Sequence, residues 1–81
     1  MEFTMYTGNG CKYCTLAKLF ITANGGTVIE KNIDTDATAK EEHGKTGALG
    51  VPVIQHKATG QAWIGFSPQI QEEIATTLGV N

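Results

Sequence analysis

Charged side chains are scarce in this 81-residue chain, at 17% against about 25% in a typical domain. The formal net charge is −2, so the basic surface that nucleic-acid binding requires is missing, and we expect no nucleic-acid partner. No apolar run approaches the ~20 residues of a membrane-spanning helix. The N-terminus has no basic segment followed by an apolar stretch, so no signal peptide is visible. We therefore expect no membrane partner and a cytoplasmic location, which would be the host cytoplasm for a viral protein.

The small size of the chain limits its functions further. The length predicts one domain over residues 1–81, with 41% apolar residues to form a modest core. So short a chain has little surface for a second function, and we expect a monomer. The sequence has only two cysteines, Cys11 and Cys14. Without an export signal they would meet a reducing cytosol, where a C-x-x-C pair is more often catalytic than structural.

The two cysteines stand at the predicted start of a helix, directly after the turn-forming segment 7–10. The first N–H groups of a helix lack intrahelical partners and carry partial positive charge, which stabilises a thiolate. We predict that Cys11 caps this helix as the nucleophile, with a pKa below that of an ordinary thiol, and that the charge of Lys12 favours the thiolate further. Cys14 lies one turn further in, so we expect it to be more buried and to act as the resolving thiol.

Two other interpretations of the cysteine pair have less support. A structural disulfide is disfavoured because so short a loop removes little entropy from the unfolded chain. A zinc site needs about four ligands, and the remaining candidates, His43 and His56, are too far apart for the histidine spacing of common zinc modules. We expect no metal ligands within one chain. A metal or cluster module remains an alternative if two chains share a metal through their C-x-x-C pairs.

Hydrophobic periodicity and turn residues predict four strands and three helices. The strands are expected at 3–6, 27–33, 51–54 and 62–66, and the helices from 11 to the segment 24–26, over 37–43 and over 68–78. The first helix should bury Leu16, Ala17, Phe20 and Ile21, whereas His43 should lie on the surface of the second. The order β-α-β-α-β-β-α gives a parallel βαβ unit extended by an antiparallel hairpin, in a four-stranded mixed sheet. With a C-x-x-C pair near the βαβ unit of a cytosolic chain, this order predicts an α/β thioredoxin-like fold.

Three motifs resemble those of a known family: CKYC at 11–14, GVPV at 50–53 and WIGFSP at 63–68. The first is similar to the glutaredoxin site, and the last resembles the NrdH-redoxins, which are glutaredoxin-like in sequence but thioredoxin-like in partner use. The resemblance implies reduction of protein disulfides, with ribonucleotide reductase as electron acceptor and thioredoxin reductase as the partner that resets the oxidised form. It implies no bound cofactor besides a redox-active disulfide between Cys11 and Cys14.

The resemblance also implies a set of residues around the two thiols. Pro52 would be a cis-proline facing the thiols, and Val51 would offer its backbone to an extended segment of the partner. With these two, the residues expected to bind substrate are Lys12, Tyr13, Val51, Pro52, Trp63, Gly65 and Phe66.

The sequence departs from the patterns of both families, so glutathione remains an alternative reductant to thioredoxin reductase. Glutathione-using glutaredoxins commonly carry a lysine where this chain has Gly8, and often a Gly-Gly and an acid within the stretch that corresponds to 65–68. Both differences weaken a glutathione site. The NrdH-redoxins, in turn, usually have other residues than Lys12 and Tyr13 between the cysteines. A glutathione-dependent dithiol glutaredoxin is therefore the alternative, with a carboxylate of glutathione meeting Lys12 or Lys45.

Overall fold

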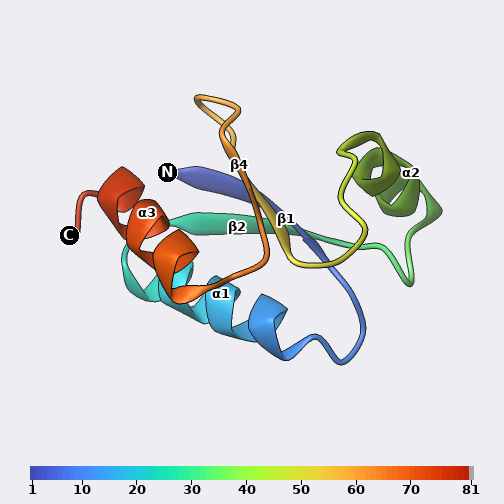
Figure 1. Ribbon diagram of the computed structural model, residues 1–81, viewed down its shortest axis with the longest axis horizontal. Coiled ribbons are helices and arrows are strands. Elements are labelled where there is room, and N and C mark those ends of the chain that lie inside the picture. The colour runs from blue at the N-terminus through green and yellow to red at the C-terminus, as the bar shows by residue number, and fades with distance from the viewer. Residues whose placement is uncertain (81) are drawn as a thin grey trace.

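The computed structural model describes residues 1–80 and confirms the predicted order of elements (Figure 1). The elements are β1 (Glu2–Thr7), α1 (Lys12–Ala23), β2 (Thr27–Asn32), α2 (Ala37–Lys45), β3 (Val53–His56), β4 (Ala62–Ile64) and α3 (Pro68–Leu78). None of the helices in this part of the chain combines the length and apolar character needed to cross a membrane.

The strands form one mixed sheet in the order β2-β1-β3-β4. β1 is parallel to β2, with Phe3 opposite Val28, and antiparallel to β3, with Met5 opposite Ile54. β3 and β4 form the predicted antiparallel hairpin. The helix α1 crosses over between the two parallel strands, as a βαβ unit requires. The thioredoxin-like fold expected from the sequence is therefore confirmed.

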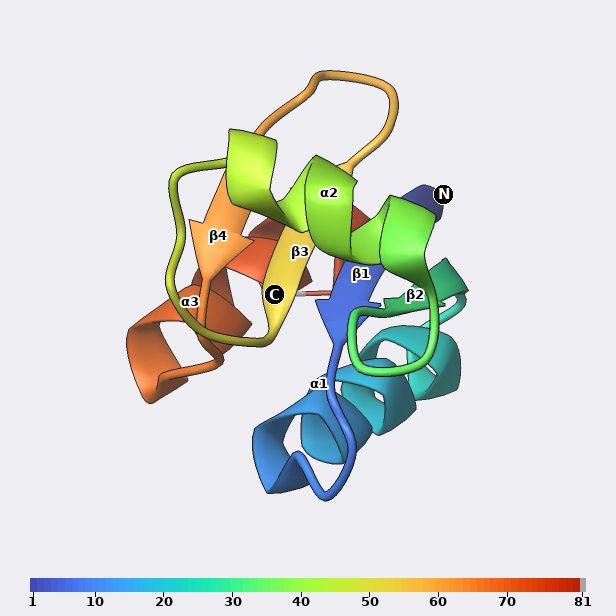
Figure 2. The same cartoon turned by 90° about the vertical axis from the view of Figure 1, so that its right-hand side faces the viewer.

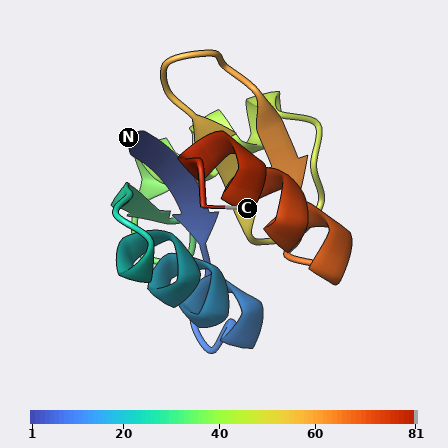
Figure 3. The same cartoon turned by 90° about the vertical axis from the view of Figure 1, so that its left-hand side faces the viewer.

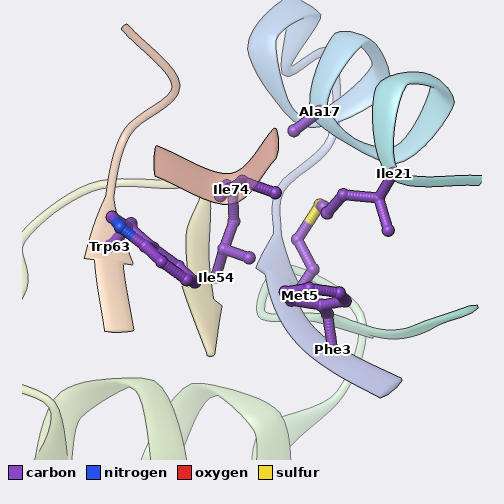
Figure 4. Packing of buried hydrophobic residues seen from close by; sticks show 7 residues of the cluster. All are labelled: Phe3, Met5, Ala17, Ile21, Ile54, Trp63 and Ile74. Atoms are coloured by element: carbon purple, nitrogen blue, oxygen red, sulfur yellow. The ribbon is translucent and has the colours of Figure 1, made fainter. Parts of the chain in front are cut away.

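Helices cover both faces of the sheet. α2 lies across one face (Figure 2), and α1 and α3 lie together against the other (Figure 3). The main core fills the space between the sheet and the pair α1 and α3, where successive strand residues alternate between faces. Figure 4 shows this cluster, which contains Phe3, Met5, Ala17, Ile21, Ile54, Trp63 and Ile74. A smaller cluster on the α2 face contains Tyr6, Ala48 and Val53, with Ile33 packed against it.

All four strands differ from the prediction by one or two residues at one or both ends, and β3 continues to His56 rather than ending at position 54. Two of these differences lie beside a proline or a glycine. β3 begins at Val53 rather than at position 51, because Pro52 has no N–H to give to the ladder; its carbonyl instead accepts the N–H of Gly65 at 2.7 Å. β4 ends at Ile64 rather than at Phe66. Gly65 has φ +89°, a left-handed conformation that turns the chain from β4 towards α3.

The helices begin at side chains typical of helix caps, whereas the burial of the helix faces differs from the prediction. Asp36 and Ser67 cap α2 and α3 through their side-chain oxygens. α2 runs two residues past His43, to Lys45. Leu16 was expected to be inward but is 41% exposed, because α3 covers only part of α1. His43 was expected at the surface but is buried, since α2 turns it towards the sheet.

Candidate active site

A disulfide between Cys11 and Cys14 sits at the start of α1. Cys11 is the N-cap residue, with extended backbone, and its Sγ accepts the N–H of Cys14 at 3.1 Å. Cys11 is half-buried, whereas Cys14 is only 4% exposed. The cap position predicted for Cys11 and the deeper position predicted for Cys14 are therefore confirmed, while the lowered pKa of Cys11 stays a prediction.

The loop before the cysteines is tied to the end of β2. Asn9 donates its backbone N–H to Asp34 Oδ2 at 2.7 Å, and its side-chain oxygen accepts the amide of Asn32 at 3.1 Å. Gly10, with φ +69°, lets the chain turn from this loop into α1. The position of Cys11 is thus set by contacts with residues more than twenty positions further along the chain.

Gly8, in the same loop, lies close to the side chains of Asp34 and Val51. A Cβ atom placed there would lie 3.1 Å from Asp34 Oδ2 and 3.3 Å from a methyl group of Val51. Both distances are tighter than most real Cβ contacts. The loop before the cysteines and the loop before β3 therefore meet at Gly8, and a side chain at this position would push them apart.

A cavity of about 600 Å³ opens beside the disulfide, on the side of α1 that faces β2. Its lining includes both cysteines, Lys12, Lys18 and Glu30. Glu30 accepts hydrogen bonds from the Lys18 ammonium at 3.1 Å and from the Thr7 hydroxyl at 3.0 Å. These two hydrogen bonds, that of Lys18 first, lower the pKa of the Glu30 carboxyl. Lys12 makes no ion pair within residues 1–80, so it is the unpaired cation at this cavity.

The Val51–Pro52 bond is cis, as the family resemblance implied. Pro52 is buried and Val51 is half-buried. The close approach of Val51 to Gly8 brings this loop next to the segment that leads into Cys11. Gly65, another residue expected to bind substrate, is joined to Pro52 by the hydrogen bond described above.

An open groove of about 450 Å³ runs between α1 and α3. Its lining consists of Tyr13, Leu16, Phe20, Phe66, Pro68 and Gln71. Tyr13, which stands between the two cysteines in the sequence, is 57% exposed, and the rings of Phe20 and Phe66 are 5.9 Å apart at its base. Two of the residues expected to bind substrate, Tyr13 and Phe66, thus share one mostly apolar surface.

Trp63 differs from the other expected substrate-binding residues. It is 5% exposed, belongs to the main core and donates its indole N–H to Glu73 Oε1 at 3.1 Å. Its contacts in the structure are those of a core residue, and a role in binding a partner stays a prediction.

The sequence did not reveal every residue near the cysteines. Neither Lys18 nor Glu30 is predicted by the sequence to lie at the site, because their pairing joins a helix to a strand twelve residues away. The burial of His43 and its bond to the loop before Val51 were also missed. Among residues 1–80, no three His, Cys, Asp or Glu side chains gather closely enough to hold a metal ion.

A cysteine pair at the start of the helix that follows the first strand, on a mixed sheet covered by helices on both faces, defines a thiol–disulfide oxidoreductase of the thioredoxin fold. The model of the glutaredoxin family matches residues 3–58. Since this match spans well over half of the sequence, the chain belongs to the glutaredoxin family.

Solved structures share the fold of this chain. A point mutant of the thioredoxin-like protein BC3987 superposes with a TM-score of 0.82 at 20% identity, covering 98% of this chain and 96% of its own. NrdH-redoxin from Escherichia coli has a TM-score of 0.75 at 27% identity, with coverages of 91% and 95%. Glutaredoxin 1 from Francisella tularensis has a TM-score of 0.67 at 23% identity, with coverages of 94% and 92%. No curated protein sequence matches the chain significantly.

Proposed function

We propose that this protein reduces protein disulfides, donates electrons to ribonucleotide reductase and is reset by thioredoxin reductase. The observation that carries the dithiol chemistry is the half-buried Cys11 at the helix cap, with Cys14 buried directly behind it. The cytoplasm, where thiols are kept reduced, suits this function. A monomer that consists of one domain is sufficient for this function.

The reaction transfers two electrons from the dithiol to the substrate. The thiolate of Cys11 attacks one sulfur of the substrate disulfide, which forms a mixed disulfide and expels the other sulfur as a thiolate. Cys14, having lost its proton, then attacks Cys11 Sγ, which closes the Cys11–Cys14 disulfide and releases the second substrate thiolate. The N–H of Cys14, 3.1 Å from Cys11 Sγ, is a donor that favours the attacking thiolate.

Two features favour a protein over glutathione as the reductant. Gly8 stands where glutathione-using glutaredoxins commonly carry a lysine, and a side chain there would meet Asp34 and Val51. The apolar groove at Tyr13 and Phe66 offers a surface of the kind that protein partners cover. NrdH-redoxin, which has a thioredoxin-like activity profile, is 27% identical to this chain.

A direct comparison of reductants tests the proposal. Insulin reduction is measured with NADPH and thioredoxin reductase, and hydroxyethyl-disulfide reduction with NADPH, glutathione and glutathione reductase. We expect turnover in the first assay and little in the second, with Cys11→Ser inactive in both. Turnover on glutathione alone would refute the choice of reductase. Reduction of the oxidised ribonucleotide reductase by the reduced protein tests the acceptor separately.

A glutathione-dependent glutaredoxin is the second candidate, and Lys12 is the observation in its favour. Its ammonium lines the cavity beside Cys11 and makes no ion pair within the described part of the chain, so a carboxylate of glutathione could meet it. Under this alternative, Lys12→Gln should raise the KM for glutathione in the hydroxyethyl-disulfide assay. A matched change at Lys40, an exposed residue on α2, should leave that KM unchanged.

A further inference from the structure

We propose that His43 is a positioning residue for substrate binding: through the carbonyl of Gly50 it sets the direction of the Val51 N–H. This inference deepens the proposed function and rests on it, because it takes the substrate to be a disulfide carried by an extended peptide. His43 lies on α2, on the opposite face of the sheet from the helix that carries the cysteines (Figure 2).

The hydrogen bond from His43 to Gly50 is short and shielded from water. His43 is 6% exposed, and its Nε2 lies 2.8 Å from the Gly50 oxygen. A carbonyl oxygen only accepts hydrogen bonds, so Nε2 must carry the proton. The ring also packs edge-on against Tyr6, with centroids 5.9 Å apart and an interplanar angle of 65°. Such a buried donor strongly favours one orientation of the carbonyl.

The segment between His43 and Gly50 is held at its other end as well. The carbonyl of His43 accepts the hydroxyl of Thr46 at 2.6 Å and the backbone N–H of the same residue at 3.0 Å. The Thr46 hydroxyl in turn accepts the N–H of Ala48 at 3.2 Å. The backbone of His43 therefore anchors the start of the loop, and its side chain anchors the end.

Planarity of the peptide group carries this constraint to Val51. The Gly50 carbonyl and the Val51 N–H belong to one trans peptide, so they point in opposite directions. With the carbonyl held towards α2, the N–H points away from α2. This N–H has no hydrogen-bond acceptor among residues 1–80. It is thus a free donor on a loop that touches Gly8, three residues before Cys11.

A free backbone donor on the loop that approaches Gly8, in the segment leading into Cys11, suits one chemical class of substrate. An extended peptide that carries a disulfide can place a backbone carbonyl against the Val51 N–H, as in the addition of a strand to a sheet. A small disulfide without a peptide backbone cannot make this bond. His43 should therefore matter for peptide disulfides and not for small ones.

Single-turnover kinetics with two substrates test this difference without any reductase. The chemically reduced protein reacts either with dithiobis(nitrobenzoate) or with an extended peptide whose cysteine carries the same thionitrobenzoate group. Both reactions release the same coloured thiolate. We expect His43→Leu to raise the half-saturation concentration for the peptide by about fivefold to tenfold. This is the change in affinity that the loss of one hydrogen bond between protein and peptide would cause. The limiting rate and the rate with the small disulfide should change by less than about twofold.

Two further variants separate positioning from loss of stability. His43→Gln keeps an N–H donor and should restore part of the peptide affinity. His56→Leu removes the other buried histidine, whose partners are Thr59 and the ring of Phe3, and should leave both reactions unchanged. Equal slowing of both substrates by His43→Leu, or an unchanged half-saturation concentration for the peptide, would overturn the proposal.

A spectroscopic measurement on the unaltered protein covers the case in which a variant fails to fold. An unreactive peptide with serine in place of its cysteine should shift the Val51 amide resonance of the oxidised protein as it binds. An unmoved Val51 amide at saturating peptide would overturn the proposal independently. By contrast, a wild-type protein that reacts with the peptide disulfide but not with thioredoxin reductase would refute only the choice of reductase.

Discussion

Gly8→Ala should destabilise the protein through a contact that lies beside the active site. The added methyl group would stand 3.1 Å from Asp34 Oδ2, and ordinary contact begins at 3.4 Å, so the carboxylate must retreat by about 0.3 Å. That movement lengthens the 2.7 Å hydrogen bond from the Asn9 N–H. The methyl of Val51, at 3.3 Å, must also shift.

The expected cost follows from these contacts. A hydrogen bond to a charged group contributes about 1.5–3 kcal/mol when shielded, and less here because Asp34 is exposed. Partial loss of this bond, with slight overpacking against Val51, should lower the free energy of unfolding by about 1 kcal/mol. For a chain of this length the melting temperature should fall by about 4–8 °C.

Urea unfolding followed by fluorescence measures this cost, since Trp63 is the only tryptophan and is buried. Gly44→Ala is the matched control, because the same methyl group would have nothing within 4 Å in the last turn of α2. We expect that control to be neutral or stabilising by up to about 1 kcal/mol.

A double-mutant cycle identifies the cause. In a background with Asp34→Ala, the carboxylate is gone, so Gly8→Ala should cost about 0.5 kcal/mol less than in the wild type. Additive effects, or a Gly8→Ala protein as stable as the wild type, would refute the reasoning.

Three other perturbations test the site and the core. Cys14→Ser should leave Cys11 able to attack but unable to release its partner, so mass spectrometry should find the substrate trapped on Cys11; free turnover would contradict this assignment. Glu30→Gln should destabilise the protein at neutral pH by only a few tenths of a kcal/mol, because the pair with Lys18 is largely exposed. Since the fold lowers the pKa of Glu30, that contribution should be present above its ordinary pKa and vanish as the pH falls through the lowered value, as urea unfolding at several pH values would measure. Ile74→Ala removes a fully buried side chain from the core and should cost about 2–5 kcal/mol in the same assay; a cost below about 1 kcal/mol would contradict the packing in Figure 4.

Some features of the protein were predictable because their causes are local. Asp36 and Ser67 cap helices through bonds to N–H groups only two or three residues away. The cysteine spacing places Cys14 one turn inside the helix that Cys11 caps. The order of strands and helices also followed from periodicity and from the position of the glycines, which act over a few residues.

Other features were missed because their causes are distant in the sequence. Leu16 fits the apolar stripe of α1 as well as Ala17 does, yet 41% of its surface is exposed because α3 covers only part of α1. His43 lies in a polar helix, and its burial depends on Tyr6 and on the loop at Gly50. Periodicity reports which residues share a face, but not how far another element extends over that face.

The sequence by itself determined the chemistry of this protein: two thiols at a helix start, the order of the elements and the family to which they belong. Only the tertiary structure decided what surrounds the thiols. It brought Glu30 and Lys18 to the cavity beside the disulfide, Val51 against Gly8, and His43 to the loop before Val51. The physical reason is that capping and periodicity act within a turn or two of the chain, whereas contacts across a sheet depend on strand register and on the packing of helices against it.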